Sequence, residues 1–115
     1  MQPRVFNLSL FLQPSEVEPI RSVVTETPDA TVVAWLVQPG QHIAPHVHPH
    51  GQDTWMVISG RGEYQIDAAG RSVPIAAGEV LVAGTGEVHG VLCTSAEPLV
   101  FMSVVCPGDA GYVPL

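Results

Sequence analysis

Residues 40–60 read GQHIAPHVHPHGQDTWMVISG, a histidine-rich run that leads directly into an aromatic and β-branched segment. Four of the five histidines of the chain fall within this run, and the fifth, His89, lies well downstream. A carboxylate, Asp53, follows the histidines at once. Imidazole and carboxylate together form the ligand set that divalent transition metals prefer in proteins. The run therefore indicates a metal site.

The spacing of His46 and His48 supports this interpretation. Side chains two residues apart leave the same face of a strand, with Cα atoms about 6.5–7 Å apart, and two imidazoles can span that gap to reach one ion. On a helix, positions i and i+2 point in different directions. Pro45 and Pro49 also exclude a helix interior here. We therefore predict that the histidine pair chelates from a strand.

The alternation of side chains along strands predicts the neighbours of the ligands. If Asp53 and His89 point inward, the side chains two and four positions further along their strands do so as well. These pocket candidates are Trp55, Val57, Val91 and Cys93. The result is a polar ligand cluster in an apolar pocket, which is the usual character of a small-molecule site.

Two further polar residues are pocket candidates. Gln52 stands next to Asp53 and offers an amide oxygen, but its side chain is expected to point to the opposite face of the strand. His50 follows Pro49 and is expected to lie in a loop at the mouth of the cavity. A proton-shuttling role for His50 is the alternative.

The composition predicts a single globular domain. The chain has 115 residues, enough for one hydrophobic core. Its 46% hydrophobic and 13% charged content is apolar for a small protein, which favours a buried self-association surface and hence a homodimer. No segment approaches the roughly 18–20 apolar residues of a membrane span.

Charge and cysteine usage exclude several classes of partner. The net charge is −7, and the basic residues are four arginines without any lysine. Nucleic acid and anionic membrane surfaces both require clustered basic residues, so neither is an expected partner. Cys93 and Cys106 do not form a C-x-x-C pair, and no export signal is recognised. We therefore expect reduced thiols and a cytoplasmic location.

Short apolar runs alternate with turn signals along the chain. Strands are expected at residues 5–12, 20–26, 31–38, 42–48, 53–59, 63–67, 71–75, 80–83, 88–94 and 99–106. Strands at such regular spacing predict an all-β sandwich or barrel. One helical turn is expected at residues 14–18, and an irregular segment at 107–115. The N-terminal strand at 5–12 is a candidate for a dimer interface.

Two spacings resemble the motifs of the cupin family. The first motif, G(X)5HXH(X)3,4E(X)6G, is matched over residues 40–60 by Gly40, His46, His48, Asp53 and Gly60, with Asp in place of Glu. The second motif, G(X)5PXG(X)2H(X)3N, is matched over residues 78–93 by Gly78, Gly84, Gly86, His89 and Cys93, with Gly for Pro and Cys for Asn.

The resemblance implies a small single-domain cupin over residues 1–115, folded as a double-stranded β-helix of the jelly-roll type. It also implies that His46, His48 and His89 are metal ligands, with Asp53 as the fourth. Asp53 is one methylene shorter than the usual Glu, so two other roles stay open for it: orienting a histidine, or acting as a general base. The ligand set suits Fe, Mn, Ni, Cu or Zn, and the general order of protein affinities for these metals does not identify which one binds.

Three hypotheses for function follow. The first is a mononuclear metal-dependent enzyme on a small organic substrate, a non-haem oxidoreductase of dioxygenase-like chemistry, with lyase and isomerase chemistry also open. The second is a non-catalytic module that binds or senses a small molecule in the same pocket. The third is a structural barrel with relic histidines. Neither a G-x-S-x-G nucleophile elbow nor a phosphate-binding glycine loop occurs in the sequence.

Overall fold

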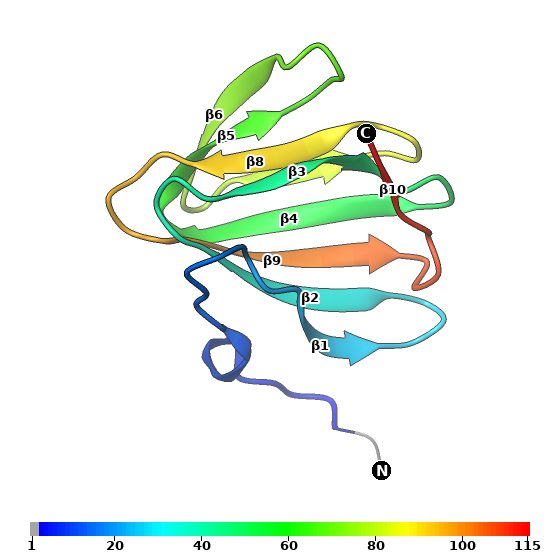
Figure 1. The fold of residues 1–115 in the computed structure, drawn as a ribbon. Helices are drawn as coiled ribbons and strands as arrows, with labels where there is room; N and C mark the ends of the chain where they lie inside the picture. The colour runs from blue at the N-terminus through cyan, green and yellow to red at the C-terminus, as the bar shows by residue number, and fades with distance from the viewer. Residues whose placement is uncertain (1–2) are drawn as a thin grey trace.

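The computed structural model describes residues 3–115 and consists of two facing antiparallel β-sheets (Figure 1). The first sheet has the order β1 (Ser22–Glu26), β2 (Thr31–Val37), β9 (Leu99–Cys106), β4 (Gln52–Ser59) and β7 (Val80–Ala83). The second has the order β10 (Val113–Pro114), β3 (His42–Val47), β8 (His89–Cys93), β5 (Arg61–Gln65) and β6 (Ser72–Ala76). Apart from the pairs β1–β2 and β5–β6, which each stay in one sheet, successive strands pass between the two sheets, which confirms the predicted double-stranded β-helix.

Gly60 joins β4 in the first sheet to β5 in the second. Its φ of +82° lies in the left-handed region, which side chains other than glycine rarely adopt. A Cβ added at this position would also lie only 2.7 Å from the Cα of Leu99. Both constraints explain why a glycine ends the histidine-containing segment.

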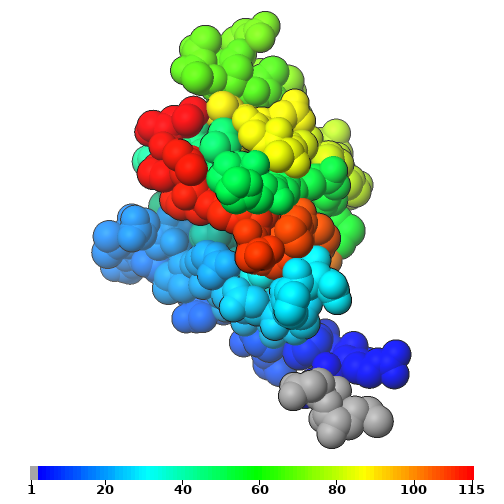
Figure 2. All heavy atoms as spheres, turned by 90° about the vertical axis from the view of Figure 1, so that its right-hand side faces the viewer, coloured from blue at the N-terminus to red at the C-terminus, as the bar shows by residue number. Residues whose placement is uncertain are grey.

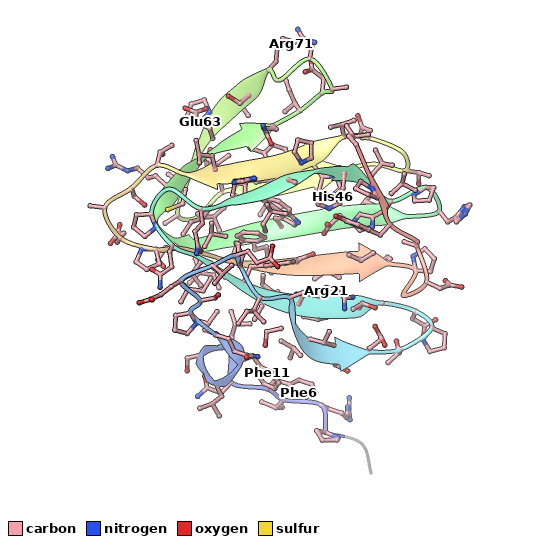
Figure 3. The ribbon with its side chains drawn as sticks, in the orientation of Figure 1. Phe6, Phe11, Arg21, His46, Glu63 and Arg71 are labelled. Carbon is pink, nitrogen blue, oxygen red and sulfur yellow. The ribbon has the colours of Figure 1, made fainter. Side chains whose placement is uncertain are left out.

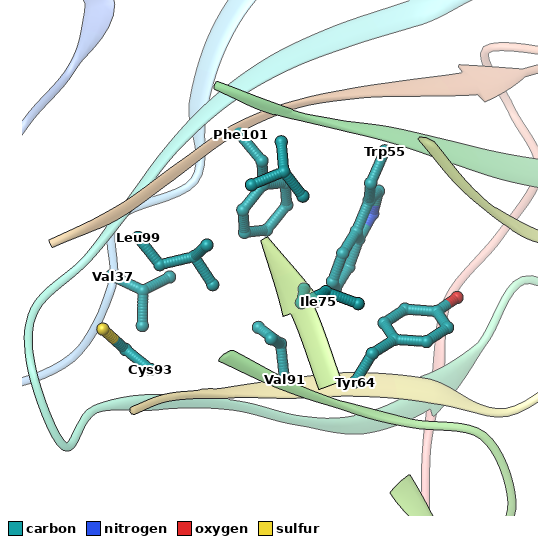
Figure 4. Close-up of a cluster of buried hydrophobic side chains, with 9 residues drawn as sticks. Val37, Trp55, Tyr64, Ile75, Val91, Cys93, Leu99 and Phe101 are labelled. Atoms are coloured by element: carbon teal, nitrogen blue, oxygen red, sulfur yellow. The ribbon is translucent and has the colours of Figure 1, made fainter. Parts of the chain in front are cut away.

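The alternation predicted for β4 and β8 is confirmed. Asp53, Trp55 and Val57 are buried on β4, and His89, Val91 and Cys93 are buried on β8. Most of these side chains join a single hydrophobic cluster (Figure 4). Its members are Val37, Trp55, Val57, Tyr64, Ile75, Val91, Cys93, Leu99 and Phe101. Burial of such apolar surface contributes on the order of 25 cal/mol per Å².

This hydrophobic cluster fills one end of the barrel. On β9, Phe101 lies opposite Val57, and the Phe101 ring stacks on Trp55 with ring centroids 4.2 Å apart. Asp53 lies opposite Val105, toward the other end of the same strand. Figure 2 views the molecule from that other end, where the C-terminal segment (red) and the segment ahead of β1 (blue) lie on the same side.

The N-terminal strand expected at residues 5–12 is wrong. A 3-10 helix, η1 (Leu8–Phe11), occupies this region, and the side chain of Asn7 caps it by accepting a hydrogen bond from the Ser9 amide. The segment lies beyond β1 and pairs with no strand (Figure 1). The edge of β1 stays unpaired on this side, because the chain forms the capped 3-10 turn instead of extending along it.

The C-terminal segment is only partly irregular. Its residues Val113 and Pro114 form β10, which pairs with Val47 and His46 of β3. The helical turn expected at residues 14–18 is absent, and residues 16–18 form a bend instead. The other strands lie within two residues of the expected bounds. Within residues 3–115, no helix has the length and apolar character needed to cross a membrane.

Candidate metal centre and adjoining cavity

Four side chains meet between the sheets at the open end of the barrel. Their candidate ligand atoms all lie within 4.8 Å of one another, and the residues are His46, His48, Asp53 and His89. β3 and the residue that follows it supply the first two, β4 supplies Asp53 and β8 supplies His89. His46 lies directly opposite His89 in the β3–β8 pairing. The β3–β8 pairing and the packing of the facing sheet, which carries β4, therefore bring together residues that are distant in the sequence.

Each of the three histidines is oriented by a backbone carbonyl. The Nδ1 atoms of His46, His48 and His89 lie 2.9, 2.6 and 3.0 Å from the carbonyl oxygens of Ala44, Gly111 and Glu87. A carbonyl oxygen only accepts, so each Nδ1–H donates. The Nε2 atom of each neutral ring is then left with a free lone pair, which is the form that binds metals.

Asp53 lies at the centre of the group. Its Oδ2 is 3.1 Å from Nε2 of both His48 and His89, and its Oδ1 accepts a 2.6 Å hydrogen bond from the Ser103 hydroxyl. Burial by itself raises the pKa of Asp53, but the contacts with His48 and His89, which are hydrogen bonds when Nε2 of these rings carries a proton, and the hydrogen bond from Ser103 outweigh it and hold the pKa below its usual range. Asp53 is therefore a carboxylate.

The geometry fits a bound cation. With Nδ1–H donated to a carbonyl, the Nε2 lone pairs of neutral His48 and His89 both face a negatively charged oxygen at 3.1 Å. This contact is unfavourable unless a positive charge lies between the atoms, either a proton on an imidazole or a metal ion. Ligands at about 2.1 Å from one ion are at most about 4.2 Å apart, so a small contraction of the group completes a site. The shorter Asp53 side chain reaches the group.

The two histidines of the H-x-H pair differ in basicity. Burial is the main reason that the pKa of His46 is lowered, to about 4. The hydrogen bond to Asp53 is the main reason that the pKa of His48 is raised. His46 thus stays neutral at mildly acidic pH, as a ligand must.

A cavity of about 440 Å³ opens beside the four-residue cluster. It is lined by Arg21, Val33, Trp35, Ile43, His46, His48, Asp53, Trp55, Ser103, Val105, Gly108, Ala110, Gly111 and Tyr112. The volume lies within the range of about 300–1,000 Å³ that is typical of small-molecule sites. Most of the wall is apolar, and the polar groups are concentrated at the cluster.

The pocket candidates divide between three environments. Trp55 lines the cavity, as predicted. Val57, Val91 and Cys93 face inward but belong to the hydrophobic cluster and not to the lining. The alternation of side chains along the strands correctly predicted that these three point inward, but alternation does not distinguish the hydrophobic core from the cavity lining. His50 and Gln52 are exposed and do not line the cavity either.

Sequence reasoning missed residues from both ends of the chain. Tyr112 places its ring over His46, with centroids 5.0 Å apart, and Arg21 contributes a guanidinium from the segment just before β1. Figure 3 shows Arg21 and His46 on opposite sheets. Neither residue lies in a sequence motif. Tyr112 could be found only by predicting the β3–β10 pairing, and Arg21 only by predicting the order of strands in the first sheet.

Comparison with known proteins agrees with this geometry. Residues 33–105 match the family described as "Cupin domain". A crystal structure of an uncharacterized conserved protein with a double-stranded β-helix domain from Klebsiella pneumoniae is 50% identical, and the match covers 98% of this chain and 97% of that one with a TM-score of 0.95. No curated protein matches the chain at a significant level.

More distant structures share the fold alone. KdgF from Halomonas sp. is 24% identical over 83% of this chain and 85% of that one, with a TM-score of 0.70. Oxalate decarboxylase is 21% identical over 88% of this chain but only 29% of that one, with a TM-score of 0.76. Some proteins of this architecture are therefore enzymes, and the likeness names no reaction for this chain.

Proposed function

Since this chain belongs to the cupin family, we propose that it is a mononuclear metal-dependent enzyme acting on a small organic substrate. The observation that carries the proposal is the convergence of three carbonyl-oriented histidines and one carboxylate at the wall of a 440 Å³ cavity. A purely structural metal site has no need of an adjoining cavity, whereas a catalytic site keeps an open position for substrate.

The proposed ligands have distinct tasks. His46, His48 and His89 supply neutral nitrogen donors, and Asp53 supplies a carboxylate that Ser103 orients. When bound, a divalent transition metal ion supplies Lewis acidity or a template for dioxygen and substrate. The apolar walls around Trp55 exclude water from the reacting groups. Dioxygenase-like chemistry is the reaction class that we propose first.

Metal analysis of variants tests the proposal. Untagged protein is expected to carry one transition metal ion per chain, measured by mass spectrometry. The His46→Ala/His48→Ala double variant and His89→Ala are expected to lose it. His42→Ala is the matched control, because His42 lies exposed on the same strand, β3, outside the cluster. Failure to bind metal after anaerobic reconstitution, or retention in the double variant, would refute the proposal.

The metal identified then directs the activity screen. Iron or copper directs it toward dioxygen consumption with candidate substrates, and zinc or nickel toward lyase or isomerase reactions. Loss of turnover in His89→Ala but not in His42→Ala is the expected result. Full turnover in a metal-free variant would show that the reaction does not use this site.

A non-catalytic binding module is the second candidate. The lining of the cavity offers no carboxylate other than Asp53, whose oxygens already contact Ser103, His48 and His89. Among the described lining residues, no second carboxylate is therefore available as a general base separate from the four-residue cluster. A ligand recovered unchanged after prolonged incubation with the metal-loaded protein would favour this second function.

We propose a homodimer as the assembly. The outward face of β4 and β7 exposes Met56, Ile58, Val80 and Val82, each between 38% and 59%. Met56 lies opposite Val80 in the β4–β7 pairing, so these side chains form one apolar surface. In η1, Leu10 is also exposed. Contiguous apolar surfaces of this kind are often interaction sites.

A further inference from the structure

We propose that Arg21 selects an organic carboxylate as the ligand of the cavity, with the apolar body of that ligand packed against the wall that Trp35 and Trp55 contribute. This inference rests on the proposed function, because it concerns the same cavity with its metal bound. The residues that carry it come from opposite sheets: Arg21 precedes β1 in the first, and the cluster residue His46 lies on β3 in the second (Figure 3).

Arg21 is the cationic side chain of the cavity wall. The chain has four arginines and no lysine, and the other three, Arg4, Arg61 and Arg71, do not line this cavity. An arginine placed at the wall of an apolar cavity is well suited to fork-like pairing with a carboxylate.

A structural role does not account for Arg21. Its nearest acidic partner is Glu26, at 3.9 Å, and both side chains are more than half exposed. An exposed ion pair at this distance contributes between zero and about 1 kcal/mol. The guanidinium is therefore free to turn toward a ligand at little cost.

The charge balance of the loaded site favours an anion. A divalent ion beside the Asp53 carboxylate and three neutral histidines leaves one positive charge, and Arg21 adds a second. The protein as a whole has a net charge of −7, which repels anions elsewhere on its surface. The metal-loaded cavity is therefore a positively charged site on a negatively charged protein, and it attracts an anionic ligand.

The cavity favours a carboxylate over a phosphate. Phosphate sites in proteins usually combine several donors, such as a glycine-rich loop at a helix N-terminus. This cavity offers one guanidinium, and no α-helix occurs in residues 3–115. Its other walls are apolar, from Val33, Ile43 and Val105 besides the two tryptophans. A compact acid with an apolar body matches this combination.

Ligand titration of zinc-loaded protein tests the inference. Cyclohexanecarboxylate and its neutral isostere cyclohexanecarboxamide are the probes, with cyclohexyl phosphate as a third arm. Both tryptophans of the chain line the cavity, so quenching of their fluorescence reports binding directly. Neither of the first two probes absorbs where tryptophan is excited. Zinc content is measured on every sample.

The carboxylate is expected to bind at least about tenfold more tightly than the carboxamide, as one charge-assisted hydrogen-bonded pair implies. Arg21→Gln is expected to remove that difference, and Arg21→Lys to restore part of it. Arg61→Gln is the matched control, because Arg61 is exposed on β5 and lies outside the cavity. Arg21 is itself exposed, so its replacement leaves the fold intact.

Several results would overturn the inference. These are equal affinity for carboxylate and carboxamide, an unchanged carboxylate affinity in Arg21→Gln, preference for the phosphate, and no saturable binding of the carboxylate. Failure of the proposed function has a different signature, namely no retained zinc. In that case the same titration of the metal-free protein still decides the role of Arg21, through the difference between wild type and Arg21→Gln.

Discussion

His48 is held by the backbone carbonyl of Gly111, which lies 63 residues further along the chain. The Nδ1 atom of His48 is 2.6 Å from this oxygen, while its Nε2 faces Asp53 at 3.1 Å. The contact depends on β10, whose pairing with β3 brings the C-terminal segment to the cluster. The last residues of the chain therefore orient a histidine of the candidate metal centre, although they belong to neither sequence motif.

Gly111→Ala tests this coupling. Gly111 has a φ of +80°, and an added Cβ would lie 3.1 Å from Pro49, so the substitution displaces the carbonyl that His48 uses. Loss of such an orienting group typically lowers metal affinity by about 10–100-fold. Competition with a chelating dye measures the affinity.

Gly70→Ala is the control for Gly111→Ala. Gly70 has a φ of +85° with open space around it, and it lies in the turn between β5 and β6, at the opposite edge of the second sheet from β10. Both substitutions strain the backbone by about 1–2 kcal/mol. Equal metal affinity in the two variants would show that strain, and not the Gly111 carbonyl, is responsible.

Phe101→Ala is expected to destabilise the fold without removing the metal ligands. Phe101 is fully buried and stacks on Trp55 in the hydrophobic cluster. Removing such a ring typically costs about 3–5 kcal/mol of unfolding free energy, measured by urea denaturation. Val73→Ala, at a 41% exposed position on β6, is expected to cost much less. Similar losses in both variants would contradict this account of the core.

The metal-free protein is expected to lose stability as the pH falls from about 6.5 to about 4 through His46. The pKa of His46 is lowered to about 4 by burial, so in this range the unfolded chain binds a proton that the folded protein does not. Stability therefore rises with pH across the window. His48 acts in the opposite direction, because its pKa is raised by Asp53.

Unfolding free energies of metal-free wild type and His46→Gln, measured across this pH window, isolate the His46 contribution. The variant lacks the titrating group, so its stability is expected to fall less steeply toward acidic pH. An equally steep fall in wild type and variant would mean that other groups control the acid response.

The proposed dimer makes a prediction of its own. Light scattering is expected to give twice the chain mass of 12.2 kDa at micromolar concentration. Val82→Glu is expected to produce monomers if the face of β4 and β7 is the interface, and Leu10→Glu if η1 forms it. Wild type that is monomeric at these concentrations would refute the homodimer.

Local patterns were sufficient to predict most strands, and the motif spacings selected the four side chains that the structure brings together as a candidate metal centre. Alternation along β4 and β8 predicted the buried faces, because successive side chains of a strand always point in opposite directions. The spacing of His46, His48, Asp53 and His89 was informative for a related reason. Family motifs record positions that the barrel brings together, so the spacing already carries long-range information. The N-terminal prediction failed because the Asn7 side chain caps a 3-10 turn at Leu8–Phe11, and the run does not extend along the edge of β1.

The cavity and its specificity depended on tertiary structure. Arg21, Tyr112 and Gly111 reach the cluster through the order of strands in the two sheets and the pairing of β10 with β3. Parity also could not separate Trp55, which lines the cavity, from Val57, which lies in the core two residues further along the same face. Position along a barrel axis depends on long-range register, and no local periodicity encodes it.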